Sequence, residues 1–292
     1  MIAMNTIVKA FAKINLFLEI RGINDIGYHL LDSVMQSVSL CDEIELEQTE
    51  SGKIEIFCDV EGVPCDETNI AHKAARLFYE KTGEKNSGLS ITLKKNIPHQ
   101  AGLGGGSADG AGVLVALNAI YGNKLSENEL CEIGVKVGAD VPFCIVGGTK
   151  RAQGIGEMFT PLSPMPDCSI VIAKPDFGVS TVKAYADYDL LSNPQRLDIS
   201  GVITSLKNDN LTDLASSLHN AFEQVVPNEE LNSIKAIMSS CGALGSLMSG
   251  SGSAIFALFN DNSKAQACVA TLQKANIRAH LCSPSKVGCQ IL

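Results

Sequence analysis

A glycine-rich segment between Pro98 and Asp109 constrains this chain more than any other feature. It reads Pro-His-Gln-Ala-Gly-Leu-Gly-Gly-Gly-Ser-Ala-Asp, follows the strand-like stretch 89–93 and leads into the apolar run 113–117, which is typical of a helix. Glycines accept positive φ, so backbone N–H groups can converge on an anion, and the N-terminus of the next helix adds about half a positive charge. The order strand, glycine loop, helix therefore predicts a phosphate-binding loop.

This loop matches neither of the two common nucleotide motifs. No Lys-Ser or Lys-Thr pair follows its glycines, as a P-loop requires. A dinucleotide fingerprint that starts at Gly102 would need its third glycine at position 107, where the chain has Ser107. We therefore expect a third kind of nucleotide loop.

Charge and composition narrow the partners of the chain. The net charge is −9, so no basic excess exists to bind nucleic acid or an anionic membrane. Aromatic residues make up 5% and tryptophan is absent, which disfavours a stacking platform for single-stranded nucleic acid. We expect a small-molecule substrate, and the oligomeric state is left open.

The cysteines and the first residues indicate a cytoplasmic protein. The ten cysteines form no Cys-x-x-Cys pair, so zinc spacing is missing and free, mostly buried thiols in a reducing compartment are expected. The N-terminal residues lack the basic region of a signal peptide, and no apolar run reaches the ~18 to 20 residues that a membrane span needs.

Periodicity predicts a chain of mixed α and β elements, and 292 residues suggest two domains. A helix over 70–81 is bounded by Thr68 or Asn69 as its cap and by Gly83 as its end. Ser126 and Glu129 form a capping box for a helix that ends near 138. The other predicted elements of this half are strands over 8–20, 33–40, 43–47 and 53–57 and a helix over 107–119.

Three prolines within 160–167 mark the best candidate linker. It divides the chain into domains 1–160 and 161–292. Beyond it, strands and helices alternate as in a small α+β sandwich. The predicted elements are strands over 169–173, 254–259 and 279–282 and helices over 181–186, 211–225, 229–240 and 263–275.

Lys13 and Asp140 are candidates for a catalytic pair. Lys13 and Asn15 share one face of an otherwise apolar strand, and Asp140 follows a helix at an expected helix-to-strand junction. Together they suit phosphoryl transfer, because the lysine would hold the carboxylate ionised while the carboxylate accepts a hydroxyl proton. The alternatives are a solvated lysine on an edge strand and an aspartate that only caps or turns the chain.

Two further segments have a functional and a purely structural interpretation. Gly27-Tyr28-His29 offers an aromatic ring and an imidazole that could stack on and hydrogen-bond a base, or could pack at a hairpin end. The Gly/Ser run 248–254 is either a tight turn or a second anion-binding nest. The other four histidines show no ligand spacing.

In this order the segments resemble the motifs of the GHMP kinase superfamily, named for galactokinase, homoserine, mevalonate and phosphomevalonate kinases. The resemblance runs from about residue 9 to 259 and is specific in combination, although each segment alone is weak. The matching segments are 12–16, 27–29, 102–107, 138–142 and 249–252.

The resemblance implies an α+β, two-domain GHMP kinase fold. It has an N-terminal α/β domain with a left-handed βαβ crossover, a C-terminal ferredoxin-like α/β sandwich and the site between them. It implies ATP as phosphoryl donor, with Asp140 as the base and Lys13 as its partner, and it places Asn69 and Lys95 near the adenine or its ribose. The residues implied to cradle the ATP phosphates are Pro98, His99, Gln100, Ala101, Gly102, Leu103, Gly104, Gly105, Gly106, Ser107 and Ala108.

Within the family, the resemblance at Gly27-Tyr28-His29 implies the branch that phosphorylates the 2-hydroxyl of a cytidine-diphosphate-linked methylerythritol. There Tyr28 and a second aromatic, here Tyr185, would sandwich the cytosine, His29 would read its polar edge, and Asn15 would lie near the substrate. The alternatives are a homoserine or mevalonate type of kinase and a nucleotide-binding regulator without activity. The presence of both Lys13 and Asp140 argues against the regulator.

The chain departs from the family pattern at three positions. Gln100 stands where glycine or alanine is usual, and Gly110 and Gly112 replace alanines, which predicts a looser start of the helix. No further acidic residue is placed as a metal ligand, so we expect magnesium to be carried on the ATP phosphates and water, with Ser107 as its one possible protein contact.

Overall fold

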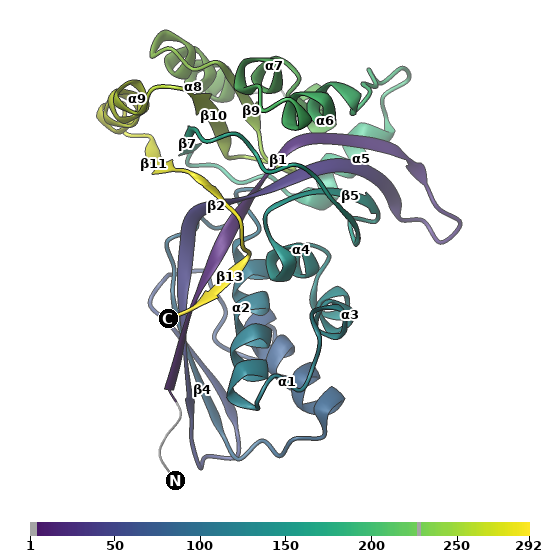
Figure 1. Ribbon diagram of the computed structural model, residues 1–292, viewed down its shortest axis with the longest axis vertical. Helices are drawn as coiled ribbons and strands as arrows, with labels where there is room; N and C mark the ends of the chain where they lie inside the picture. Colours follow the sequence, from purple (N-terminus) through teal and green to yellow (C-terminus); the bar gives the residue numbers. More distant parts are fainter. Residues whose placement is uncertain (1–4, 227–228) are drawn as a thin grey trace.

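The computed structural model describes residues 5–226 and 229–292 and contains two β-sheets with their helices (Figure 1). The mixture of helices and both parallel and antiparallel strand pairs confirms the α+β class. The first sheet has the strand order β13-β1-β2-β4-β3, with β5, β6, β8 and β12 attached beside this path. The second has the order β11-β7-β10-β9.

The longest feature of the fold is the antiparallel pair β1 (Asn5–Ile23) and β2 (His29–Gln48), which reaches from the first sheet to the helices of the second (Figure 1). The prediction of two separate strands over 33–40 and 43–47 is wrong, because one strand runs through both. Asp42 lies between them fully buried, and its Oδ1 accepts from the backbone N–H groups of Asn96 and Ile97.

The first sheet contains a βαβ unit. Strands β3 (Ile54–Cys58) and β4 (Leu89–Lys94) pair in parallel, and α1 (Ile70–Thr82) connects them. The expected caps of α1 are confirmed, since Asn69 Oδ1 accepts from the Ala71 N–H and Gly83 has φ 71°. The hand of this crossover stays a prediction. Helix α3 (Glu127–Val137) has the predicted capping box.

Helix α2 (Gly105–Ile120) begins two residues earlier than predicted, with Gly104 before it at φ 71°. Its two unusual glycines have a packing reason. A Cβ on Gly110 would lie 2.7 Å from Ile70 Cγ2, and one on Gly112 would lie 2.3 Å from Ile44 Cδ1. These glycines therefore let α2 pack closely on α1 and β2, and the looser helix start stays a prediction.

The second sheet is ferredoxin-like, as predicted. Its strands are β7 (Ser169–Lys174), β9 (Gly245–Met248), β10 (Ile255–Phe259) and β11 (Arg278–Cys282), and every neighbouring pair is antiparallel. Helices α8 (Glu229–Ser240) and α9 (Asn262–Lys274) pack on it. Strand order 4-1-3-2 with a helix after the first and third strands defines the ferredoxin-like βαββαβ unit.

Two predictions for single elements are wrong. The expected strand after Asp140 is the short helix α4 (Val141–Val146). The expected helix over 211–225 is α7 (Leu211–Ser216), followed by strand β8 (His219–Asn220) and the 3-10 turn Ala221–Gln224.

The sequence pattern did not predict four strands of the first sheet. They are β5 (Thr149–Gly154), β6 (Met158–Pro161), β12 (Pro284–Ser285) and β13 (Cys289–Ile291). It also did not predict the helix α6 (Ser200–Lys207). Because β12 and β13 pair with β2 and β1, the end of the chain returns to the first sheet. The domain division at residue 160 stays a prediction.

All ten cysteines are free thiols, but only Cys144, Cys268 and Cys282 are buried, six are half-buried and Cys65 is exposed, so the expectation of mostly buried thiols is wrong. Among the described residues, no helix combines the length and the hydropathy of a membrane span.

Candidate active site

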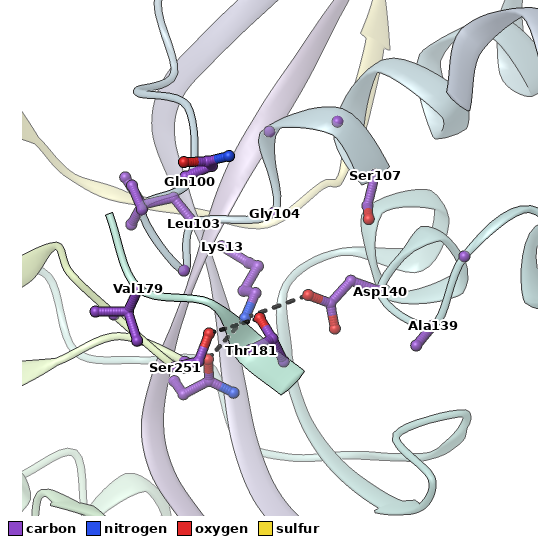
Figure 2. A pocket seen from close by; sticks show the side chains of 18 of the residues that line it. Lys13, Gln100, Leu103, Gly104, Ser107, Ala139, Asp140, Val179, Thr181 and Ser251 are labelled. Carbon is purple, nitrogen blue, oxygen red and sulfur yellow. Dashed lines mark hydrogen bonds and ion pairs between the residues drawn. The ribbon is translucent and has the colours of Figure 1, made fainter. Parts of the chain in front are cut away.

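A cleft of about 940 Å³ lies where the glycine loop meets several other segments of the chain (Figure 2). Among them are the middle of β1, residues 138–140 before α4, residues 178–181 at the start of α5 (Thr181–Asp189) and the turn 250–252 between β9 and β10. The segments come from both halves of the chain, so the fold gathers four of the five matching motifs at one place, all except 27–29.

The glycine loop rests on the Gly/Ser turn of the second sheet. Gly102 has φ 73°, and a Cβ there would lie 2.0 Å from the Ser249 carbonyl oxygen. Ser249 Oγ donates to the Gly102 carbonyl (2.9 Å), and the Ala254 N–H donates to the Ala101 carbonyl (3.1 Å). The backbone of the loop is thereby fixed, and glycine is required at 102.

The ten loop residues from Pro98 to Ser107 line the cleft, whereas Ala108 is buried beneath it. The first N–H groups of α2 have no partner within the helix, so this wall of the cleft can bind an anion. Gln100 has φ 50°, a left-handed conformation that glycine adopts more easily, so the backbone here would suit a glycine better than the glutamine that this chain has.

Lys13 and Asp140 meet in the cleft, with Lys13 Nζ 3.4 Å from Asp140 Oδ2 (Figure 2). The Lys13 side chain is 5% exposed and that of Asp140 39%. Strand β1 lies inside the sheet, between β13 and β2, so the alternative of a solvated lysine on an edge strand is wrong. Asp140 stands at the N-cap of α4 but makes no capping bond, which leaves its carboxylate free for Lys13.

The Lys13 side chain has a fixed environment. Its Nζ donates to Asn15 Oδ1 (2.8 Å), and its backbone N–H donates to the Leu103 carbonyl of the glycine loop (3.0 Å). Gly104 leaves room for the lysine stem, since a Cβ there would lie 3.0 Å from Lys13 Cγ. The position of the ammonium group is thus tied to the position of the loop.

Of the residues expected around the acceptor substrate and its base, only Tyr185 and Asn15 line the cleft, and Tyr28 and His29 lie outside its lining. Tyr185 lines the cleft, and the His29 ring stacks on it with 4.3 Å between centroids and 23° between planes. His29 Nε2 lies 2.8 Å from Asp189 Oδ1. Tyr28 is 57% exposed, lies outside the cleft lining and makes no ring contact with the described part of the chain. Burial, and then the negative charge of Asp140, raise the pKa of Tyr185 to about 12.

Lys95 lines the cleft, but its ammonium is held between the carboxylates of Asp42 and Asp109. Burial opposes the charge of Lys95, yet these two carboxylates raise its pKa above the ordinary value. Asn69 is the N-cap of α1 and also donates to the Pro64 carbonyl (2.6 Å), and it does not line the cleft.

Several residues of the cleft were not singled out from the sequence. The hydroxyl groups of Thr181 and Ser251 lie 2.8 Å apart across it, one at the start of α5 and the other in the Gly/Ser turn (Figure 2). Ser251 belongs to a motif that the sequence shows, whereas Thr181 has no pattern of its own. Apolar side chains that the sequence gives no means to distinguish from core also line the cleft, namely Leu18, Leu31, Met35 and Phe222.

Comparison with known protein families decides the family of this chain. The model described as GHMP kinases N terminal domain matches residues 69–148, and that described as GHMP kinases C terminal matches residues 202–278. The chain belongs to the GHMP kinase family. The first match contains the glycine loop and Asp140, and the second contains β9 and β10 of the second sheet together with α8 and α9.

Individual relatives agree with this family. A protein of Clostridium beijerinckii named 4-diphosphocytidyl-2-C-methyl-D-erythritol kinase is 44% identical over 91% of this GHMP kinase and 95% of its own length. A protein of the same name from Caldicellulosiruptor saccharolyticus is 44% identical over 87% of this chain and 88% of its own.

Solved structures extend the comparison to the whole fold. A crystal structure of a 4-(cytidine 5'-diphospho)-2C-methyl-D-erythritol kinase has a TM-score of 0.79 at 32% identity and covers 97% of this chain and 99% of its own. A homoserine kinase from Cytophaga hutchinsonii has a TM-score of 0.77 at 22% identity, covering 99% and 97%, which shows a shared fold alone.

Proposed function

We propose that this protein transfers the γ-phosphoryl group of ATP to the 2-hydroxyl of 4-diphosphocytidyl-2-C-methyl-D-erythritol, a step toward isoprenoid precursors that does not pass through mevalonate. The observation that carries the proposal is the pair Lys13 and Asp140, whose Nζ and Oδ2 atoms lie 3.4 Å apart in a cleft lined by the glycine loop. Relatives with that enzyme's name, at 44% identity over most of the chain, support this acceptor.

In this mechanism the glycine loop and the N-terminus of α2 hold the ATP phosphates. Asp140 accepts the proton of the acceptor 2-hydroxyl while the hydroxyl oxygen attacks the γ-phosphorus of ATP. The bond between the γ-phosphorus and the oxygen that bridges it to the β-phosphate breaks, and ADP leaves. Lys13 orients Asp140 and stabilises negative charge on the transferred group. The buried position of Lys13 strengthens this effect, because water screens its charge little.

Magnesium would arrive with ATP. Asp140 is the one carboxylate among the described residues that line the cleft, so the site fits a cation carried by phosphate and water better than a protein cage. Ser107, whose side chain points from the first turn of α2 toward the side of the cleft that holds Asp140, is the protein contact we propose for it (Figure 2). The metal would neutralise charge on the β- and γ-phosphates.

The cytidine end would bind beside α5. The stack of His29 on Tyr185 shows that this face of Tyr185 accepts a flat ring. We propose that the cytosine takes this place, with Tyr28 closing over it, His29 moving to the polar edge of the base and Asn15 near the methylerythritol. Asn69 and Lys95 are proposed near the adenine or its ribose, Lys95 through the ammonium N–H that its two carboxylates leave free.

The remaining proposals concern the setting of the enzyme. The net charge of −9 supports an enzyme of small molecules without nucleic-acid or anionic-membrane partners, and we also propose that it is cytoplasmic. The cleft that joins segments of both sheets supports a site between two parts, for which we keep 1–160 and 161–292 as the proposed bounds, although β12 and β13 pair with the first sheet.

An acceptor assay tests the proposed function. The purified protein is given ATP, magnesium and one of three alcohols, namely the cytidine-linked methylerythritol, homoserine or mevalonate, and ADP release is followed. We expect turnover with the first alone, and NMR of the product should place the new phosphate on the 2-hydroxyl. Turnover only with homoserine or mevalonate would contradict the proposed acceptor. ATP binding without any turnover would favour a nucleotide-binding regulator without activity.

A further inference from the structure

A chain of hydrogen bonds leads from the Lys13 ammonium to a main-chain carbonyl behind it. Lys13 Nζ donates to Asn15 Oδ1 (2.8 Å), Asn15 Nδ2 donates to Ser33 Oγ (2.9 Å), and Ser33 Oγ donates to the Phe17 carbonyl oxygen (2.6 Å). All three side chains are buried. Ser33 also lines the cleft, and none of the roles proposed above uses it.

The last member of this chain fixes the direction of every bond in it. A carbonyl oxygen can only accept, so the single proton of the Ser33 hydroxyl goes to Phe17. Ser33 Oγ must then accept from Asn15, which turns the amide nitrogen of Asn15 toward Ser33 and its Oδ1 toward Lys13. In the opposite orientation the amide N–H groups would face the ammonium, and two donors would meet without an acceptor.

The local backbone makes this arrangement possible. The register between β1 and β2 shifts between Asn15 and Phe17, and a second shift lies between Phe11 and Lys13. Such bulges redirect side chains and release backbone groups from the ladder. The segment that carries Lys13 and Asn15 therefore lies between two irregularities, so side-chain bonds such as the one to Ser33 hold its polar groups in place.

We propose that Ser33 is a positioning residue that acts on phosphoryl transfer through Asn15 and Lys13. The inference rests on the proposed function, because it concerns the same site. Ser33 sets the orientation of the Asn15 amide, and the Asn15 oxygen holds the Lys13 ammonium 3.4 Å from Asp140. Without the Ser33 hydroxyl, the buried amide nitrogen lacks its acceptor, the amide turns, and Lys13 loses the partner that fixes its position.

Strand β2 offers a matched control for this proposal. Ser37 lies four residues farther along and is buried to the same degree, with 1% of its surface exposed against 2% for Ser33. Within the described chain, Ser37 Oγ has no hydrogen-bond partner. Ser33→Ala and Ser37→Ala thus each remove one buried hydroxyl from the same strand, but only Ser33→Ala interrupts the series of hydrogen bonds that leads to Lys13.

Steady-state kinetics of these variants test the proposal. We expect Ser33→Ala to lower kcat at least tenfold while KM for ATP stays within twofold, and Ser37→Ala to change neither. Ser33→Thr keeps the hydroxyl and should return kcat to within threefold of the wild type. In an Asn15→Ala background, Ser33→Ala should have no further effect, because it acts through Asn15. An unchanged kcat for Ser33→Ala, or an equal loss in both backgrounds, would overturn the proposal.

A structural readout separates this inference from the proposed function. A wild-type protein that turns over no alcohol overturns the proposed function, and the crystal structure of Ser33→Ala then decides about Ser33. We expect a turned Asn15 amide and a Lys13 Nζ that has left Asn15 Oδ1, whereas an unchanged 2.8 Å bond contradicts the inference. If Ser33→Ala does not fold, Ser33→Cys, a side chain of similar size with a weak donor, is judged by the same outcomes.

Discussion

Asp109 supports a prediction about how the stability of this enzyme depends on pH. Its side chain is buried on α2 just behind the glycine loop, with Oδ2 against Lys95, while Oδ1 has no partner among the described residues. Burial raises the pKa of Asp109 to about 8, which Lys95 offsets in part and the second carboxylate, Asp42, reinforces. Asp109→Asn keeps the size and an oxygen for Lys95 but removes the titrating proton.

The sign of the effect follows from where the proton is released. The unfolded chain releases it near pH 3.8, whereas the folded protein keeps it up to about pH 8. Between these values the folded state binds more protons, so the free energy of unfolding of the wild type falls as pH rises through this window. Each bound proton by which the two states differ changes the free energy of unfolding by about 1.4 kcal/mol per pH unit.

Urea unfolding at several pH values measures this effect. Lys95 and Asp42 readjust as Asp109 titrates, which reduces the effect. We therefore expect the free energy of unfolding of Asp109→Asn to rise by at least about 2 kcal/mol relative to that of the wild type between about pH 5.5 and 8.5. Glu129→Gln is the control. Hydrogen bonds from Ser126 lower the pKa of Glu129, so it titrates below this range and its difference from the wild type should stay constant. An Asp109→Asn curve parallel to that of the wild type would refute the reasoning.

Two further predictions concern the glycine loop and the base. Gly102→Ala adds both a strained φ and a Cβ 2.0 Å from the Ser249 oxygen, whereas Gly52→Ala, at φ 70° with no neighbour within 4 Å, adds strain alone. We expect the second to cost about 1 kcal/mol in urea unfolding, and the first to cost more and to weaken ATP binding in calorimetry; equal costs would contradict the close contact. Tyr28→Ala should raise KM for the cytidine-linked acceptor about tenfold, since stacking on a base is worth roughly 1 to 3 kcal/mol, and leave KM for ATP unchanged. An unchanged acceptor KM would place the base elsewhere.

The parts of the fold that the sequence predicted well have their signals within a few residues. Asn69 and Gly83 bound α1, and Ser126 and Glu129 form the capping box of α3, because caps act on backbone groups of the same turn. The glycine loop is of the same kind, since its conformation depends on glycines that are visible in the chain.

The errors occur where a distant residue, or a local signal other than the hydrophobic pattern, decides the structure. Asp42 resembles a turn residue, but the ammonium of Lys95 and two backbone N–H groups beyond it satisfy its carboxylate, so β2 continues through it. The segment after Asp140 is apolar and β-branched, as in a strand. The Pro142 ring at its first turn and the close packing on Gly134 instead favour the helix α4.

The candidate site shows the same division. Lys13 and Asp140 were paired from the sequence because each belongs to a motif of its own, and the structure brings them together. Ser33 was missed, because a serine within a strand has no distinguishing pattern and its importance depends on the bond to Asn15. The stack of His29 on Tyr185 likewise needs two residues that only the folded chain brings together.

The most direct test of the catalytic pair is the turnover of Asp140→Asn with ATP and the cytidine-linked methylerythritol. General-base catalysis typically contributes 10² to 10⁴-fold, so kcat should fall by at least about 10². The affinity for ATP, measured by calorimetry on the same preparation, should stay within about twofold, because Asp140 acts on the acceptor hydroxyl. A variant that keeps more than about a tenth of the wild-type kcat would contradict the assignment of Asp140 as the base.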